Sequence, residues 1–135
     1  VKPFNSISFS RVGFALWRKV KHYPAELYIA HYLGALPAAV KAGNNNYSCV
    51  IFDAEDFHRG EQSYYPGQIQ HVVEIENRFL PKANAITTAS PLIMEAYKKC
   101  YPQKNITTIH NVFSKKYFAK SILGVKRNLI SEFEN

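Results

Sequence analysis

Residues 47–53, with the sequence YSCVIFD, form an almost uninterrupted apolar run between three asparagines and an acidic segment. Such a run is typical of a parallel strand that is covered on both faces, because that strand needs no alternation of polar residues. On both sides of it the chain alternates between helix-like and strand-like segments, and the connections are too long for hairpin turns. The alternation predicts right-handed crossovers and an α/β fold built on a parallel sheet.

Apolar and β-branched runs predict the other strands of this sheet. They lie at residues 25–31 (AELYIAH), 84–90 (NAITTAS) and 105–113 (NITTIHNVF). Helical spacing of apolar residues predicts helices over 9–20 and 68–80, and a last short helical patch covers 114–120. We therefore expect a Rossmann-like parallel sheet with helices on both faces.

Two more helices are predicted from start and stop signals. One is expected to begin near residues 33–36 and to stop at Gly43 and the asparagines that follow it. The other is expected to begin after Ser90, a good helix cap, with Pro91 at its first position, and Pro102 closes it.

The composition is that of a folded domain. Of the 135 residues, 47% are hydrophobic and 14% are aromatic, which excludes a polar, disordered chain. The net charge of +7 comes from scattered Lys and Arg residues without a DNA- or RNA-binding signature, so we expect no nucleic-acid partner. Cys49 and Cys100 have no metal or redox spacing, and no segment resembles a signal peptide or a membrane span. A cytoplasmic location is therefore predicted.

Polar side chains follow each predicted strand at the point where it ends. They are His31, then residues 53–61, then Thr88 and Ser90, then His110 and Asn111. Because the carboxyl ends of parallel strands meet at one edge of a sheet, where ligands gather, these residues are expected to line a common cleft. His31, Ser90 and Asn111 are candidate substrate-binding residues, and the alternative for each is a capping or hydrogen-bonding role in the fold.

The densest group of ionisable residues consists of Asp53, Glu55, Asp56 and His58, which lie within six positions. Two chemistries are open for them. They could hold a divalent metal for hydrolysis, or they could hydrogen-bond the hydroxyls of a polyol and act as a base. No second cluster of comparable density completes a two-metal site, and the chain contains no glycine-rich phosphate loop.

The order of five segments resembles the N-terminal domain of a GT-B glycosyltransferase, of the family-4-like, retaining kind found in bacterial surface-polysaccharide clusters. The segments are YIAH (28–31), LGALPAAVKA (33–42), IFDAEDFHRGE (51–61), PKANAITTASPLIMEAY (81–97) and TIHNVF (108–113). The most specific parts are ANAITTAS and IHNVF, which are similar to two strands of that family. The chain departs from the family at Val112, where a glycine is usual, and it lacks the glycine-rich loop expected near its N-terminus.

The resemblance implies an enzyme of two domains that transfers a sugar from a nucleotide-sugar donor to a cell-surface polysaccharide or lipid-linked acceptor. It needs neither a metal nor a cofactor. Residues 1–120 would form the acceptor-side domain, incomplete at its N-terminus. Residues 121–135 would be a tail or linker toward a donor-binding domain. This fragment alone is expected to be inactive, and its basic surface would serve a peripheral contact with the inner face of the cell membrane.

Carried over by position, the resemblance also suggests site residues. His58, Asp56 and Glu55 are the catalytic candidates, with His58 expected to contact the transferred sugar. Ser90 and Asn111 would line the cleft.

Two other functions remain open from the residues alone. One is a metal-dependent hydrolase that uses Asp53, Asp56 and His58, and stoichiometric bound metal would favour it. The other is a non-enzymatic, doubly wound binding module that holds an anionic partner through its basic surface. Strongly salt-dependent association would favour the binding module.

Overall fold

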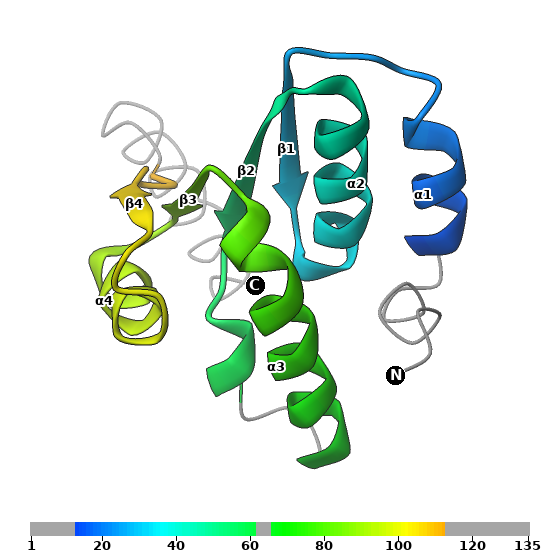
Figure 1. Ribbon diagram of the computed structural model, residues 1–135. Helices are drawn as coiled ribbons and strands as arrows, with labels where there is room; N and C mark the ends of the chain where they lie inside the picture. The colour runs from blue at the N-terminus through cyan, green and yellow to red at the C-terminus, as the bar shows by residue number, and fades with distance from the viewer. Residues whose placement is uncertain (1–12, 62–65, 113–135) are drawn as a thin grey trace, which may run out of the picture.

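The computed structural model describes residues 13–61 and 66–112. Within these ranges helices and strands alternate along the chain (Figure 1). The elements are α1 (Gly13–Val20), β1 (Leu27–His31), η1 (Leu33–Ala35), α2 (Leu36–Asn46), β2 (Cys49–Ala54), η2 (His58–Gly60), α3 (Pro66–Phe79), η3 (Leu80–Lys82), β3 (Ala85–Thr88), α4 (Pro91–Cys100) and β4 (Asn105–Thr108). The predicted alternation is confirmed here, whereas the helical patch over 114–120 and the tail over 121–135 lie outside the described residues.

The strands form one parallel sheet in the order β1-β2-β3-β4. This confirms the predicted α/β, Rossmann-like architecture. Right-handed crossovers between strands that are neighbours in both sequence and space all return on the same side of a sheet. The strand order therefore places the connecting helices α2, α3 and α4 together. Figure 1 shows α2 between β1 and α1, with α3 and α4 beside the later strands.

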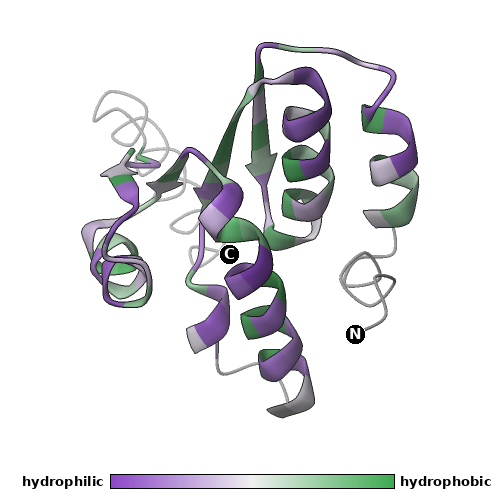
Figure 2. Ribbon diagram, viewed as in Figure 1, coloured by the Kyte–Doolittle hydropathy of each residue, from purple (hydrophilic) through white to green (hydrophobic). Residues whose placement is uncertain are grey.

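One face of the sheet is packed into the core. Its residues are every second strand position: Tyr28, Ala30, Val50, Phe52, Ala54, Ile86, Thr88 and Ile106. The apolar ones pack with residues of all three crossover helices, including Leu36, Val72 and Tyr97. Figure 2 shows hydrophobic residues along β1 and β2 and along one side of α2 and α3.

The other face of the sheet carries no helix among the described residues. Leu27 and Ile29 on β1 are 43% and 49% exposed, and β2 alternates between buried and partly exposed positions. Helices were expected on both faces from the alternation of helices and strands and from the apolar run in β2. Within the described residues, helix coverage is found on one face.

Gly43 does not end α2, contrary to the sequence-based expectation. The helix continues to Asn46, and Tyr47 closes it with a left-handed backbone at φ 55°. A Cβ atom at Gly43 would lie 2.3 Å from Cγ2 of Val50, so the glycine allows α2 to approach β2 closely. Asn46 extends the helix because its amide donates hydrogen bonds to the Ala42 carbonyl and the Tyr28 hydroxyl.

We expect Gly43→Ala to lower the free energy of unfolding by about 1–2 kcal/mol. Overpacking costs about 1–3 kcal/mol, and the better helix propensity of alanine offsets up to about 1 kcal/mol of this. Urea unfolding followed by circular dichroism measures the change. Val50→Ala in the Gly43→Ala background should recover part of the loss, and a Gly43→Ala protein more stable than wild type would contradict the packing role.

Helix α1 packs on α2, away from the sheet. The Lys41 ammonium lies 3.8 Å from the centroid of the Trp17 ring and links the two helices. Of the apolar face predicted for residues 9–20, Val20 contacts the core and Leu16 remains 39% exposed, whereas residues 9–12 lie outside the described ranges. None of the helices in the described ranges is long and apolar enough to cross a membrane.

Candidate functional site

An open cavity of about 380 Å³ lies at the carboxyl ends of the strands, on the sheet face that the described helices leave free. We call it the strand-end cavity. Its lining residues are Ile29, His31, Ile51, Asp53, Glu55, Thr87, Ala89, Ile109, His110 and Asn111. The predicted convergence of polar residues from successive strand ends is therefore observed for His31, Asp53, Glu55, His110 and Asn111, whereas Thr88 is buried in the core. The loops of a parallel sheet place them there.

A row of contacting polar side chains crosses the sheet at this cavity. His31 lies opposite Asp53 in the strand register, and Asp53 lies opposite Thr87. The His31 Nδ1 atom is 2.8 Å from Asp53 Oδ2, and the Thr87 hydroxyl donates a 2.5 Å hydrogen bond to Asp53 Oδ1. Side chains that alternate along strands bring these three residues to the same face. Both carboxylate oxygens of Asp53 thus have partners.

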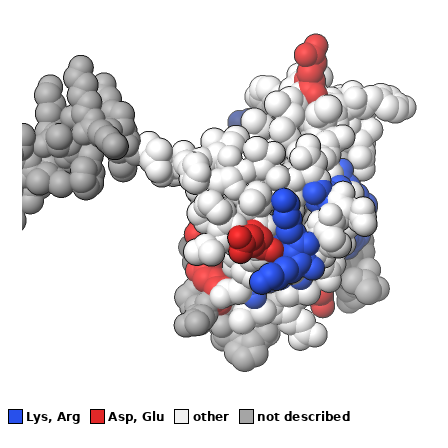
Figure 3. All heavy atoms as spheres, turned by 90° about the vertical axis from the view of Figure 1, so that its left-hand side faces the viewer, with Lys and Arg blue, Asp and Glu red and all other residues white. Residues whose placement is uncertain are grey.

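The cavity combines an apolar wall with acidic and neutral polar groups. Ile29 and Ile51, which precede His31 and Asp53 by two positions each, point to the same face of the sheet. Asp53 and Glu55 bring carboxylates, and none of the described lining residues is Lys or Arg. The local charge is therefore opposite in sign to the net charge of the chain. Figure 3 shows the side of the molecule where α4 and β4 lie, and basic side chains gather there beside acidic ones.

Ser90 and Asp56 do not line the strand-end cavity. Ser90 caps α4, because its hydroxyl accepts a hydrogen bond from the Ile93 amide. The capping role predicted from its sequence position is confirmed. The side chain of Asp56 is exposed, and its backbone carbonyl lies 3.5 Å from the Tyr97 hydroxyl.

His58 is buried, with 1% of its surface exposed, and does not line the cavity. Its ring lies against that of Tyr32, with 5.1 Å between the centroids. The Nδ1 atom is 3.8 Å from a carboxylate oxygen of Glu61 and has no hydrogen-bond partner among the described residues. This placement does not support the choice of His58 as the sugar contact, because its side chain has no access to a ligand in the cavity.

Tyr32 joins the ends of the first two strands, a feature that sequence reasoning missed. It follows His31 directly and has φ 80° and ψ 141°, a conformation that non-glycine residues rarely adopt. Its contact with His58 links the turn after β1 to the segment after β2. The sequence gives no sign of this conformation, because a tyrosine after a strand does not indicate a positive φ.

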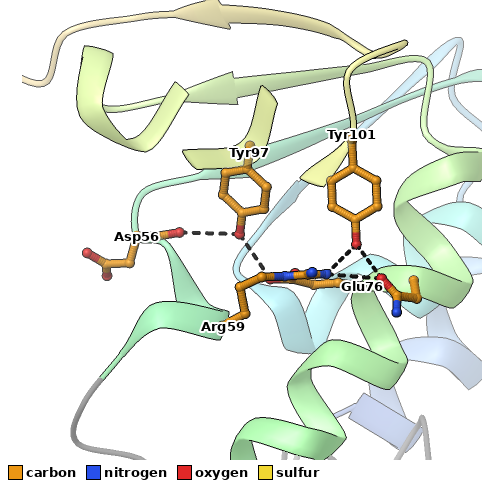
Figure 4. A network of polar contacts seen from close by, with 6 residues as sticks. Asp56, Arg59, Glu76, Tyr97 and Tyr101 are labelled. Atoms are coloured by element: carbon orange, nitrogen blue, oxygen red, sulfur yellow. Dashed lines mark hydrogen bonds and ion pairs between the residues drawn. The ribbon is translucent and has the colours of Figure 1, made fainter. Parts of the chain in front are cut away.

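A buried polar network fixes the segment that follows β2 (Figure 4). The Arg59 guanidinium pairs with the Glu76 carboxylate, which is fully buried in α3. The Tyr97 hydroxyl donates to the other oxygen of Glu76 at 3.1 Å, and Arg59 also donates to the Tyr101 hydroxyl at 2.5 Å. Figure 4 shows both tyrosines pointing from the α4 side toward Arg59 and Glu76. The network ties η2 to α3 and α4 and thereby fixes the segment after Glu55.

Burial dominates the ionisation of this network. It raises the pKa of Glu76 above its ordinary value of 4.5, and hydrogen bonds from Arg59 and Tyr97 act in the opposite direction. Burial likewise raises the pKa of Tyr97, and it raises the pKa of Tyr101 to about 12. Both tyrosines therefore keep their protons at neutral pH and act as hydrogen-bond donors.

The pKa of Glu76 leads to a testable pH dependence. A carboxyl pKa that is raised in the folded state gives stability that is complete below the unfolded pKa and is lost as the pH rises through the folded pKa. We expect the free energy of unfolding of the wild type to fall, relative to that of Glu76→Gln, as the pH rises above the ordinary carboxyl pKa of 4.5. Urea unfolding at stepped pH measures this difference. A difference that grows in favour of the wild type with rising pH would contradict it.

Three side chains of the cavity also have the composition of a metal-ligand group. His31, Asp53 and Glu55 can each offer one ligand atom, and these atoms lie within 4.8 Å of one another. The metal set predicted from sequence was Asp53, Asp56 and His58. In the structure, Asp53 belongs to such a group, and its neighbours in the group are His31 and Glu55 instead of Asp56 and His58.

In comparisons with known proteins, no protein-family model and no curated protein matches this chain.

Proposed function

We propose that this chain is the acceptor-side domain of a glycosyltransferase, which transfers a sugar from a nucleotide-sugar donor to a cell-surface polysaccharide or lipid-linked acceptor. The observation that carries the proposal is the convergence of His31, Asp53, Glu55 and Asn111 on one open cavity at the carboxyl ends of parallel strands. The sequence resemblance to GT-B enzymes points to the same region of the chain.

The chemistry of the strand-end cavity suits a sugar. Carboxylate, imidazole and amide groups provide acceptors for hydroxyl donors, and the amide of Asn111 also provides a donor. Ile29, Ile51 and Ile109 offer apolar area for the C–H face of a pyranose ring. A small number of polar groups on a mostly apolar wall is the usual design of a small-molecule site.

The donor phosphates would bind in a different domain. The described residues that line the cavity include two carboxylates and no Lys or Arg, so a diphosphate placed there would meet like charge. The chain also lacks a glycine-rich phosphate loop. We therefore assign the acceptor to this cavity and the nucleotide-sugar to a partner domain, with a peripheral membrane contact for a lipid-linked acceptor.

Nuclear magnetic resonance titration of the ¹⁵N-labelled chain tests the ligand assignment. A set of methyl hexopyranosides and uridine diphosphate serve as separate probes. We expect one or more of the glycosides to shift signals of His31, Glu55 and Asn111, and we expect the nucleotide to leave these signals in place. Shifts at the cavity from the nucleotide alone, or from none of the probes, would contradict the assignment of a sugar to this cavity.

A second candidate function is a cation-dependent hydrolase, favoured by the grouping of His31, Asp53 and Glu55. A divalent ion held by one imidazole and two carboxylates can activate a bound water. Calorimetric titration with Mn²⁺ and Zn²⁺ separates the two functions. One-to-one binding that is lost in Asp53→Asn would favour the hydrolase, and the glycosyltransferase proposal expects no such binding.

A third candidate function is a non-enzymatic module that binds its partner through the basic surface. It requires an anionic partner whose association weakens strongly with salt and does not respond to changes in the cavity. Figure 3 shows acidic side chains among the basic ones on the side of α4 and β4, which weakens the case for a purely electrostatic surface there.

A further inference from the structure

The contacts among His31, Asp53 and Thr87 indicate which ring nitrogen of His31 carries the hydrogen. A carboxylate only accepts hydrogen bonds. Asp53 Oδ1 receives the Thr87 hydroxyl, so Oδ2 is the oxygen that faces the imidazole, at 2.8 Å from His31 Nδ1. At this distance an unprotonated Nδ1 would set its lone pair against a carboxylate oxygen, so the contact favours the hydrogen on Nδ1.

The other ring nitrogen is then an acceptor. In a neutral imidazole, one nitrogen carries the hydrogen and the other presents a lone pair. With Nδ1 protonated, Nε2 has the lone pair. The His31 side chain is 66% exposed, lines the cavity, and has no Nε2 partner among the described residues.

We infer that Asp53, itself held by Thr87, fixes His31 as the Nδ1–H tautomer, so that Nε2 is the atom that accepts a hydrogen bond from a hydroxyl of the ligand. This inference rests on the proposed function for the identity of the ligand as a sugar. It adds the accepting atom and the two positioning residues. Asp53 and Thr87 position the His31 ring.

The same geometry restricts the class of ligand. A group that binds at Nε2 must donate a hydrogen, and the nearby Glu55 carboxylate is also an acceptor. A fully ionised phosphate has acceptors only, and it would meet two carboxylates without a Lys or Arg among the described lining residues. A neutral ligand with hydroxyl groups satisfies both acceptors. The site therefore favours ligands that donate hydrogen bonds over fully ionised phosphates.

The tautomer can be observed directly in the labelled chain. Long-range ¹H–¹⁵N correlation spectra at about pH 8, above the ordinary histidine pKa of about 6.5, distinguish the protonated from the unprotonated ring nitrogen. We expect His31 to carry its hydrogen on Nδ1, with its signals assigned by their loss in His31→Gln. A hydrogen on Nε2 would overturn the inference.

Substitution of Asp53 gives a second test. In Asp53→Asn, the Thr87 hydroxyl keeps the side-chain oxygen as its acceptor, so the amide NH₂ faces Nδ1 and donates to it. We expect the hydrogen of His31 to move to Nε2. Glu74→Gln is the matched control, because Glu74 lies 3.7 Å from His71 and away from His31. An Asp53→Asn protein that folds with the tautomer of His31 unchanged would count against the positioning role.

Chemical modification of the wild type provides a readout that does not depend on the folding of a variant. Diethyl pyrocarbonate reacts at an unprotonated imidazole nitrogen, which bonds to the carbonyl carbon of the reagent while monoethyl carbonate leaves. We expect His31 to be modified at Nε2 at least as fast as the exposed His22, with the rates followed by mass spectrometry. Slower modification than at His22 would contradict a free Nε2.

The position of the acceptor atom can also be tested in a transfer assay. Glutamine at position 31 can place its side-chain oxygen near the site of Nε2, whereas asparagine reaches only the site of Nδ1. We expect His31→Gln to retain about tenfold more turnover than His31→Asn, the value of one hydrogen bond. Equal losses would overturn the role of Nε2. The tautomer does not depend on transfer, so a correct tautomer without transfer would count against the proposed function alone.

Discussion

Replacement of Arg59 by methionine is expected to lower the free energy of unfolding by about 3–5 kcal/mol, because it leaves a buried carboxylate without its partner. Glu76 is fully buried and pairs with Arg59, whose side chain is only 16% exposed. Methionine keeps much of the apolar stem, so the change isolates the loss of the guanidinium. Urea unfolding at pH 7, followed by circular dichroism, measures the effect.

The matched control is Glu74→Gln, on the helix α3 that also carries Glu76. The Glu74 side chain is 64% exposed, and its replacement should change the free energy of unfolding by no more than about 0.5 kcal/mol. Arg59→Met combined with Glu76→Leu removes both charges and should recover a large part of the loss. A single Arg59→Met variant as stable as the wild type would show that the network does not hold η2 in place.

The second large effect is expected at Glu55. The Glu55 carboxylate is exposed in the strand-end cavity and comes immediately after β2. Under the proposed function, it orients a hydroxyl of the acceptor, and the loss of an orienting group costs about 10²-fold in rate. We expect Glu55→Gln to lower kcat/KM for sugar transfer by this amount, measured on the polypeptide that contains the chain and its donor-binding domain.

The stability of the Glu55→Gln protein separates a role in the site from a role in the fold. Because Glu55 is exposed, the free energy of unfolding of the Glu55→Gln protein should stay within about 0.5 kcal/mol of that of the wild type. Glu74→Gln again serves as the control for transfer and should turn over like the wild type. Transfer by Glu55→Gln within about twofold of the wild type would remove Glu55 from the site, since twofold is less than the contribution of one hydrogen bond.

The sequence predicts the elements of this fold well where the signals are local. An apolar run marks β2, and Ser90 with Pro91 marks the start of α4, because capping and backbone restriction act within a few residues. The convergence of His31 and Asn111 also follows from sequence, since it needs only the parallel direction of the strands.

The features that the sequence does not predict depend on contacts between residues far apart in the chain. Gly43 resembles a helix stop, and only its distance to Val50 shows that it is a packing glycine. Glu76 resembles a charged interruption of an apolar helix face until Arg59, 17 positions away, is seen to pair with it. Burial of His58 depends on the η2 turn and on the positive φ of Tyr32. None of these has a local signal.

The central claim is that the strand-end cavity binds the acceptor of a sugar transfer. Separate Michaelis constants for acceptor and donor in Asn111→Ala test it most directly, because Asn111 lines the cavity and is exposed. We expect the acceptor KM to rise about tenfold, the value of one hydrogen bond, while the donor KM stays within about twofold of the wild type. A rise in the donor KM with an unchanged acceptor KM would contradict the claim.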